Sequence, residues 1–350
     1  MKGSQSELGR PREWAFDDDK YGGNRMQLQP IKIQEQRSYR GRDFPLVLSP
    51  SESETSTKDE LLNWLSRNQK KLRDLMMEHG AILLRNCPID GPDDFEAVLD
   101  SAEFINMPYV GGAAPREEVT KGRILTANES PPDQPIPFHH EMAQVPEPPA
   151  YIFFYCDIAS ETGGETAIVH SGRVYERFSK SSPEFAEKVE DLGVKYRRIM
   201  PDQDDHSSPI GRSWRSTFLT DDPQEAEEKM RSIGTNWSWQ TDGNLFTETT
   251  VVPAIRTESR TGIKTFYNSV VAAYTGWIDD RNDPKKAVVC GDDTPVDHTA
   301  VMEAHAAMQE ECVAFKWQRG DVLLIDNSLV MHSRRPYTGA RRILASIAVG

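Results

Sequence analysis

The sequence predicts a mainly β fold with flanking helices (α+β), of the sandwich or barrel kind to which the jelly roll belongs. Short apolar runs bounded by turn residues recur through the 350-residue chain, and only a few segments show helical periodicity. Strand and helix signals do not alternate as they would in a doubly wound sheet. The chain also lacks an internal repeat, so a repeat architecture is not expected.

The N-terminal region differs in composition from the rest of the chain. Residues 1–43 are polar and carry scattered apolar side chains such as Trp14 and Phe16, so we expect a loosely attached arm. Residues 44–350 are expected to form a single domain with helical insertions. Hydrophobic residues make up 37% of the chain, which is enough for a substantial core.

Several segments have the signals of helices. The capping-box pattern from Thr57 to Glu60 predicts a helix start, and leucines at helical spacing extend this helix to about His79. Gly80 is a typical residue for its end. Further helices are predicted over residues 92–103, 172–192 (as a pair), 222–234 and 296–312.

Short apolar runs predict strands over residues 81–85, 151–158, 165–170, 251–255, 264–267, 313–317, 321–325 and 342–348. Residues 108–137 form a long segment rich in proline and glycine that leads into another extended run. Loops of this length in a compact domain are usually functional or disordered. We expect this one to shape the mouth of a site.

The charge and the cysteines exclude several classes of function. The formal net charge of −14 argues against a broad basic surface for nucleic acid or an anionic membrane. The four cysteines are far apart, which indicates reduced thiols in a cytosolic compartment. The N-terminus has no basic segment followed by an apolar run, and no apolar stretch is long enough to span a bilayer. We therefore expect a cytoplasmic protein with a small-molecule substrate, and its oligomeric state is not predicted.

Residues 136–142, Ile-Pro-Phe-His-His-Glu-Met, have the pattern of an extended segment. Alternate side chains of a strand share a face, so His139 and Glu141 are expected to point together and His140 away from them. An imidazole and a carboxylate are two of the three ligands in the facial triad that binds non-haem Fe(II). The alternative is a buried histidine–carboxylate hydrogen bond.

A third candidate ligand, His332, follows the predicted strand at 321–325 and precedes a group of arginines. A metal site that splits oxygen with a keto-acid co-substrate needs a clamp for the far carboxylate of that acid, and arginine suits this role. Strand alternation places Arg341 and Arg342 on opposite faces, so only one of them is expected to be the clamp.

Several motifs resemble the Fe(II)/2-oxoglutarate-dependent dioxygenases of the taurine dioxygenase superfamily, and especially its clavaminate synthase-like branch. The resemblance covers the chain from about residue 80 to its end, with the motifs in the family order. These motifs are found at 109–116, 127–134, 138–141, 163–166, 272–277, 326–332 and 341–342.

The resemblance implies a double-stranded β-helix, which is a jelly roll, with Fe(II), 2-oxoglutarate and O₂ at the site. It implies that His139, Glu141 and His332 bind the iron. It also implies that Arg342 binds the distal carboxylate of 2-oxoglutarate and that Thr166 donates a hydrogen bond to this carboxylate. The alternative for Thr166 is a strand threonine favoured for its β-branching.

The expected activity is decarboxylation of 2-oxoglutarate to succinate and CO₂, coupled to oxidation of a C–H bond in a small polar, amino-acid-derived metabolite of specialised metabolism. Hydroxylation, desaturation and ring closure are all open to this branch. A non-catalytic protein that binds a metal or keto acid, and a zinc hydrolase, are the alternatives. Four polar residues are expected to line the mouth and contact substrate: Asn128, Glu129, Asn268 and Arg334.

Overall fold

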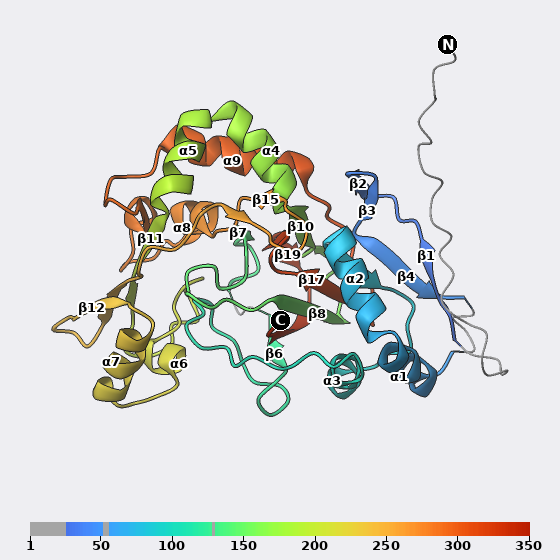
Figure 1. Ribbon diagram of the computed structural model, residues 1–350. Coiled ribbons are helices and arrows are strands. Elements are labelled where there is room, and N and C mark those ends of the chain that lie inside the picture. The colour runs from blue at the N-terminus through green and yellow to red at the C-terminus, as the bar shows by residue number, and fades with distance from the viewer. Residues whose placement is uncertain (1–25, 52–55, 128–129) are drawn as a thin grey trace, which may run out of the picture.

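The computed structural model describes residues 26–51, 56–127 and 130–350. Within them the chain forms a mixed α+β fold in which two sheets face each other and helices cover their outer sides (Figure 1). The predicted α+β class with flanking helices is confirmed, but the chain is not mainly β, because helices occupy about as much of its described part as strands do.

The larger sheet has seven strands, and only its β4–β5 pair is parallel. Its central strands are apolar along their whole length because both faces are covered. In spatial order the strands are β1 (Leu28–Ile31), β4 (Leu46–Pro50), β5 (Ala81–Leu84), β17 (Val322–Asp326), β8 (Tyr151–Ile158), β20 (Arg342–Ala348) and β6 (Leu125–Thr126).

The smaller sheet has three antiparallel strands in the order β10 (Thr166–His170), β18 (Val330–Arg334) and β7 (Ile136–His139). His332 on β18 pairs with His139 on β7, so the two histidines are neighbours across the ladder. The register shifts between His332 and Arg334, where the chain turns towards the mouth of the site.

The space between the two sheets is filled by a hydrophobic core. Phe154 and Ile343 reach into it from the larger sheet, and Ile168 and Val330 reach into it from the smaller one. The helices on the outer face of the larger sheet are α1 (Lys58–Arg67), α2 (Gln69–His79) and α3 (Pro92–Ser101). Those beyond the smaller sheet are α4 (Ser171–Ser181), α5 (Pro183–Leu192), α8 (Val270–Gly276) and α9 (His298–Glu311) (Figure 1).

A second region lies to one side of the two facing sheets (Figure 1). Its sheet contains β12 (Asn236–Trp239), β13 (Leu245–Glu248), β11 (Val194–Met200) and β16 (Val288–Cys290). A small core links this sheet to α6 (Trp214–Phe218) and α7 (Pro223–Ser232). Short ribbons complete the described chain: β2 (Arg37–Tyr39) with β3 (Arg42–Phe44), β9 (Thr162–Gly163) with β19 (Tyr337–Thr338), and β14 (Arg256–Thr257) with β15 (Lys264–Thr265).

Most predicted elements are present, with two exceptions among the strands. The strands predicted at 151–158 and 342–348 have the predicted bounds, and the capping box at Thr57 starts α1. The long helix predicted after it is instead two helices, which meet at Asn68. The predictions at 251–255 and 313–317 are wrong, because each segment makes only an isolated bridge to the rest of the structure.

The predicted N-terminal arm is wrong for residues 26–43. Here β1 is the edge strand of the larger sheet, where it pairs with β4, and the Leu28 side chain is fully buried. Residues 1–25 lie outside the described residues, so the arm stays a prediction there. Among the helices of the described segments, none combines the length and apolar character that crossing a bilayer requires.

Candidate active site

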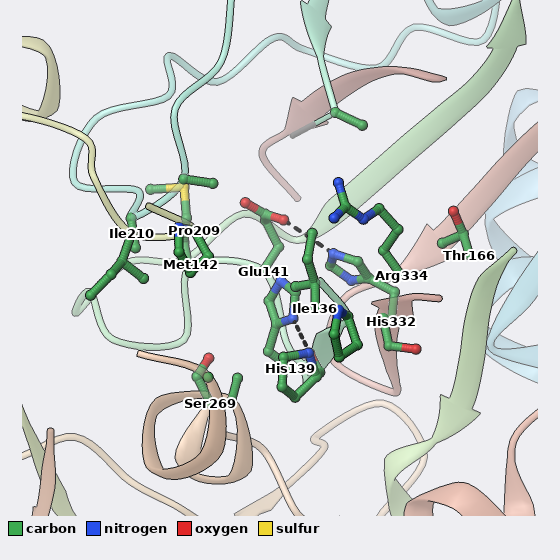
Figure 2. A pocket seen from close by; sticks show the side chains of 18 of the residues that line it. Ile136, His139, Glu141, Met142, Thr166, Pro209, Ile210, Ser269, His332 and Arg334 are labelled. Atoms are coloured by element: carbon green, nitrogen blue, oxygen red, sulfur yellow. Dashed lines mark hydrogen bonds and ion pairs between the residues drawn. The ribbon is translucent and has the colours of Figure 1, made fainter. Parts of the chain in front are cut away.

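Three side chains from one end of the smaller sheet converge on a single point. His139 is the last residue of β7, Glu141 lies in the turn that follows, and His332 lies within β18. One potential ligand atom from each lies within 4.8 Å of the other two. Figure 2 shows Glu141 and His332 pointing towards each other, with Oε2 and Nε2 3.4 Å apart. The structure thus brings together the three residues expected to bind metal.

The surrounding chain fixes these ligands. The Nδ1 atom of His139 lies 2.9 Å from the carbonyl oxygen of Pro137, which directs Nε2 towards the other two ligands. The Asn327 amide accepts a hydrogen bond from the backbone N–H of Glu141 and donates one to its carbonyl. His140 points away and stacks on Tyr267, as strand alternation predicts.

The protonation states suit metal binding. Burial, together with the neighbouring His332, lowers the pKa of His139 to about 4, so the ring is neutral near pH 7. Burial would raise the pKa of Glu141, but Arg116 and then His332 hold it well below its usual range. Neutral imidazole and ionised carboxylate are the forms that bind a metal ion.

The donor set fits Fe(II). Oε2 of Glu141 is buried and lacks a hydrogen-bond donor among the described residues, which is costly for a carboxylate oxygen. A metal ion between the three ligand atoms would satisfy it. Two imidazole nitrogens and one carboxylate oxygen form the facial triad typical of non-haem Fe(II) enzymes.

A partly buried arginine and a buried threonine lie in the same cavity as the triad. Nε of Arg341 donates to the carbonyl of Gly164 at 2.9 Å, and no described carboxylate forms a salt bridge with this arginine. Burial lowers the pKa of Arg341 to about 10, so the guanidinium stays charged at pH 7. Thr166 accepts a hydrogen bond from Trp317 through Oγ1 and can still donate its own O–H.

The arginine implied by the resemblance, Arg342, is not at the cavity, so this prediction is wrong. Its Nη1 lies 2.7 Å from Oδ2 of Asp157, and 42% of its side chain is exposed. Ile343 faces the core between the sheets whereas Leu344 faces the opposite core, below α1–α3. Arg341 shares the parity of Ile343 along β20, and it therefore points to the cavity.

The four residues expected to contact substrate differ in where the structure places them. Asn128 and Glu129 lie outside the described residues. Asn268 is buried and does not line the cavity, because its amide bonds to the backbone of Ala254 and Val270. Asn268 therefore has a structural role in the described chain.

Arg334 does line the cavity, but its visible contacts are with the protein itself. Its guanidinium donates to the backbone carbonyls of Ser130, Pro131 and Gln134 in the long loop. This arginine, two residues after His332, therefore holds the rim of the site in place.

The long loop at 108–137 shapes the cavity, as its composition predicts. It contributes Tyr109, Arg116 and Ile136 to the lining, and Met142 and Ile210 add apolar surface near the triad (Figure 2). The empty space measures about 930 Å³, part of it open to solvent.

Three residues at the site were not predicted from the sequence to act there: Arg341, Arg116 and Asn327. Strand parity could have identified Arg341, and Asn327 lies in a motif that the resemblance already included. Arg116 likewise ends the motif at 109–116 that the resemblance included, but its contact with Glu141 was not predicted.

Comparison with known proteins supports this site. The family model described as "Taurine catabolism dioxygenase TauD, TfdA family" matches residues 46–347. The chain is 48% identical to a clavaminate synthase-like protein of Arabidopsis thaliana over 319 residues, which cover 90% of this chain and 96% of the relative. It is 26% identical to the dapdiamide synthesis protein DdaC of Enterobacter agglomerans, with 78% and 83% covered.

The fold is also found in solved structures. An asparagine oxygenase in complex with Fe(II), 2S,3S-3-hydroxyasparagine and succinate superposes with a TM-score of 0.50 at 14% identity, covering 83% of both chains. The family model, the Arabidopsis relative and the three converged ligands together show that this chain belongs to the TauD/TfdA family of Fe(II)/2-oxoglutarate-dependent dioxygenases.

Proposed function

We propose that this oxygenase oxidises a C–H bond of a small polar, amino-acid-derived metabolite. His139, Glu141 and His332 bind Fe(II), and Arg341 with Thr166 binds the distal carboxylate of 2-oxoglutarate. The observation that carries the proposal is Arg341, a partly buried cation that forms no salt bridge with a described carboxylate, in the cavity that holds the triad. Hydrolysis at a zinc site does not by itself require such a cation.

The metal ion and the protein make different contributions to this reaction. Fe(II), when bound with 2-oxoglutarate and O₂, supplies the oxidation, in which the keto acid becomes succinate and CO₂. The protein supplies ligands in the correct protonation state, a clamp for the co-substrate, and a wall of apolar side chains that limits water. Arg334 keeps the loop at the rim in position.

The substrate class rests on the relatives and on the cavity. One curated relative is named for its part in dapdiamide synthesis, which supports a role in a dedicated biosynthetic pathway. The double-stranded β-helix implied by the family belongs to this proposal too, and the two facing sheets are compatible with it. Hydroxylation would add one oxygen atom to the substrate, whereas desaturation and ring closure would remove two hydrogen atoms, so product mass distinguishes these outcomes.

The decisive experiment is anaerobic addition of Fe(II) and 2-oxoglutarate to the metal-free protein. We expect a weak visible charge-transfer band from the chelated keto acid, which His332→Ala abolishes. Aerobic succinate formation then identifies substrates in a panel of amino-acid derivatives. Iron binding without the band in the wild-type protein would overturn the co-substrate assignment, and a band that persists in His332→Ala would overturn the ligand assignment.

A further inference from the structure

A second cavity adjoins the active site, and the buried side chain of Arg198 lies in its wall. Ala113, Gln144 and Trp277 line both cavities. The second cavity lies over the buried face of β11, in the region where α6 and α7 pack on the four-stranded sheet (Figure 1). Its empty space measures about 470 Å³, part of it open to solvent. Among the described residues of its lining, Arg198 is the one charged side chain.

The charge of Arg198 is not balanced by a carboxylate in contact with it. Arg198 is only 6% exposed and forms no salt bridge with a described acidic residue. Asp279 attracts it without touching it, and this carboxylate pairs with Arg281 at 2.6 Å. Burial, together with the neighbouring Arg212, lowers the pKa of Arg198 to about 10, so the guanidinium is still charged at pH 7. A buried cation of this kind is costly, and an anion in the cavity would stabilise it.

Part of the Arg198 guanidinium remains available to a ligand. Its Nη1 donates to the carbonyl of Ala113 at 3.1 Å, and its Nη2 makes a long contact of 3.4 Å with Oγ1 of Thr217. Its Nε has no acceptor among the described residues, and unlike Nε of Arg116 it is not sealed from solvent. This N–H can therefore donate to a molecule in the cavity.

Hydroxyl groups provide further donors beside Arg198. Four threonines line the cavity: Thr217, Thr235, Thr247 and Thr249. Oγ1 of Thr217 accepts from Arg198 and Oγ1 of Thr249 accepts from the N–H of Tyr196, so each hydroxyl can still donate its own proton. The Thr235 hydroxyl forms no hydrogen bond with a described residue. A cation and hydroxyl donors without a carboxylate suit an anion rather than a metal ion.

We infer that the substrate is an elongated anion, whose carboxylate or phosphate group binds Arg198 in the second cavity while the C–H bond to be oxidised lies beside the metal ligands. Ala113, Gln144 and Trp277 border the passage from one cavity to the other. The inference rests on the proposed function and narrows it, since it makes the substrate an acid of a certain length. Arg198 thereby determines specificity, whereas Arg341 serves the co-substrate.

The experiment compares acids with matched amides in protein whose co-substrate clamp is filled. Protein loaded with Zn(II) and a fixed, saturating concentration of 2-oxoglutarate does not turn over. Into this complex we would titrate the N-acetyl derivatives of glycine, 4-aminobutanoic acid and 6-aminohexanoic acid, together with their amides. The phosphonic acids of the same chain lengths form a third series. Ligand-observed NMR measures each affinity.

Arg197 provides a matched control for Arg198. It is the preceding residue of β11 and faces the opposite side of the sheet, where it pairs with Glu248 and Asp293. Arg197→Gln therefore removes the same charge outside the cavity. It is compared with the wild-type protein, Arg198→Gln, Arg198→Lys and Thr235→Val, the last of which removes one donor without breaking a described hydrogen bond.

We expect the wild-type protein to bind the best acid about tenfold to a hundredfold more tightly than its amide, the range for a charge-assisted hydrogen bond. Arg198→Gln should remove this preference, Arg198→Lys should keep part of it, and Arg197→Gln should keep all of it. Thr235→Val should weaken binding of the acid by about twofold to fivefold. Tighter binding of the phosphonic acids would identify a phosphate-bearing substrate, and the reverse order a carboxylic acid.

Equal binding of acids and amides by the wild-type protein, or no binding of any acid, overturns the inference, and this comparison needs no variant to fold. A preference for acids that survives Arg198→Gln overturns it as well. So does a preference that Arg197→Gln removes equally, because the effect is then one of overall charge.

Replacing Zn(II) by paramagnetic Mn(II) shows whether the anion belongs to a molecule that reaches the metal. Mn(II) should broaden the acetyl protons of the bound acid more than the methylene protons beside its anionic group. The opposite order, or no broadening, would assign Arg198 to a free anion and overturn the inference. Failure of the proposed function is recognised separately, because the wild-type protein then lacks the charge-transfer band with Fe(II) and 2-oxoglutarate.

Discussion

The side chain of Asn327 fixes the backbone on which the carboxylate ligand stands. Glu141 lies beyond the end of β7, so its N–H and C=O have no ladder partner and bond to the Asn327 amide instead. The same amide also donates to the carbonyl of Pro149. Met142, the next residue, has a φ of 53°, a left-handed conformation that is unfavourable for a side chain of this size. One residue thus holds an irregular turn in the geometry that metal binding needs.

Arg341, which immediately precedes β20, and Arg342, its first residue, should respond very differently to substitution. We expect Arg341→Gln to raise the KM for 2-oxoglutarate by on the order of a hundredfold, because it removes charged hydrogen bonds to a buried carboxylate. Arg342→Gln should change it by less than about twofold, since it breaks only a partly exposed ion pair with Asp157. Succinate formation at varied 2-oxoglutarate concentrations measures both, and a larger effect of Arg342→Gln would contradict the assignment.

The metal ligands could be predicted from the sequence, whereas the position of the 2-oxoglutarate clamp and the role of Arg116 could not. The spacing of His139 and Glu141 predicted that both face the metal, although Glu141 lies in the turn after β7 and is held there by the Asn327 amide. Choosing between Arg341 and Arg342 requires knowing which face of β20 meets the smaller sheet. Arg116 reaches Glu141 only because the long loop folds back, and no local pattern encodes that path.

Among the connections between elements, the one at His170 depends on a histidine whose ring is neutral in the folded protein. It is the last residue of β10 and the N-cap of α4, where its Nδ1 accepts a hydrogen bond from the N–H of Gly172. Its ring packs against that of Tyr39 in a tilted arrangement, with centroids 4.1 Å apart. Burial, aided by Arg40, lowers the pKa of His170 to about 3 although Glu176 opposes the shift.

This buried histidine should make the protein sensitive to acid. The unfolded chain binds a proton at this position below about pH 6.5, whereas the folded chain binds one only below about pH 3. Between these values the unfolded state binds more protons, so stability falls as the pH is lowered. From pH 7 to pH 5, the wild-type protein should lose about 2 kcal/mol more unfolding free energy than His170→Asn.

Urea denaturation of both metal-free proteins at the two pH values measures this difference. Asparagine is chosen because it can still cap α4 but does not titrate. An identical loss of stability in the two proteins would show that His170 is not the group responsible.

The elements that were predicted correctly are those whose own sequence determines them. Residues 151–158 and 342–348 are mostly apolar and β-prone segments that pair with each other within the larger sheet, and their bounds follow from composition. The strand Val330–Arg334 was missed because a histidine, a serine and an arginine interrupt its apolar character. Residues 313–317 have that character but lie where no strand continues beside them, so they form a single bridge.

For the whole molecule, metal binding should be linked to global stability. The ligands come from two strands of one sheet and from the turn beside it, so unfolding separates them and releases the ion. With free Mn(II) at one hundred times its dissociation constant, the unfolding free energy should rise by about 2.7 kcal/mol. His332→Ala should gain much less. Denaturation with and without Mn(II) measures both values, and an equal gain would contradict the ligand assignment.

Long-range pairing explains why the whole fold was predicted less well than its parts. In the sequence, the residues of β1 look like part of a polar arm. Their place in the sheet is seen only from the pairing with β4 and the burial of Leu28. The four-stranded sheet containing β11 and β13 is similarly built from weakly apolar segments that gain their partners from distant parts of the chain. Such pairings depend on tertiary packing rather than on local propensity.

The anchoring of the rim by Arg334 has a consequence for protein engineering. The described hydrogen bonds from Arg334 to this rim end on the backbone carbonyls of Ser130, Pro131 and Gln134, which every residue type provides. A rim segment of equal length transplanted from another member of the family should therefore dock onto the same guanidinium and redirect substrate choice. A recipient that lacks an arginine at this place would receive the new segment without its anchor.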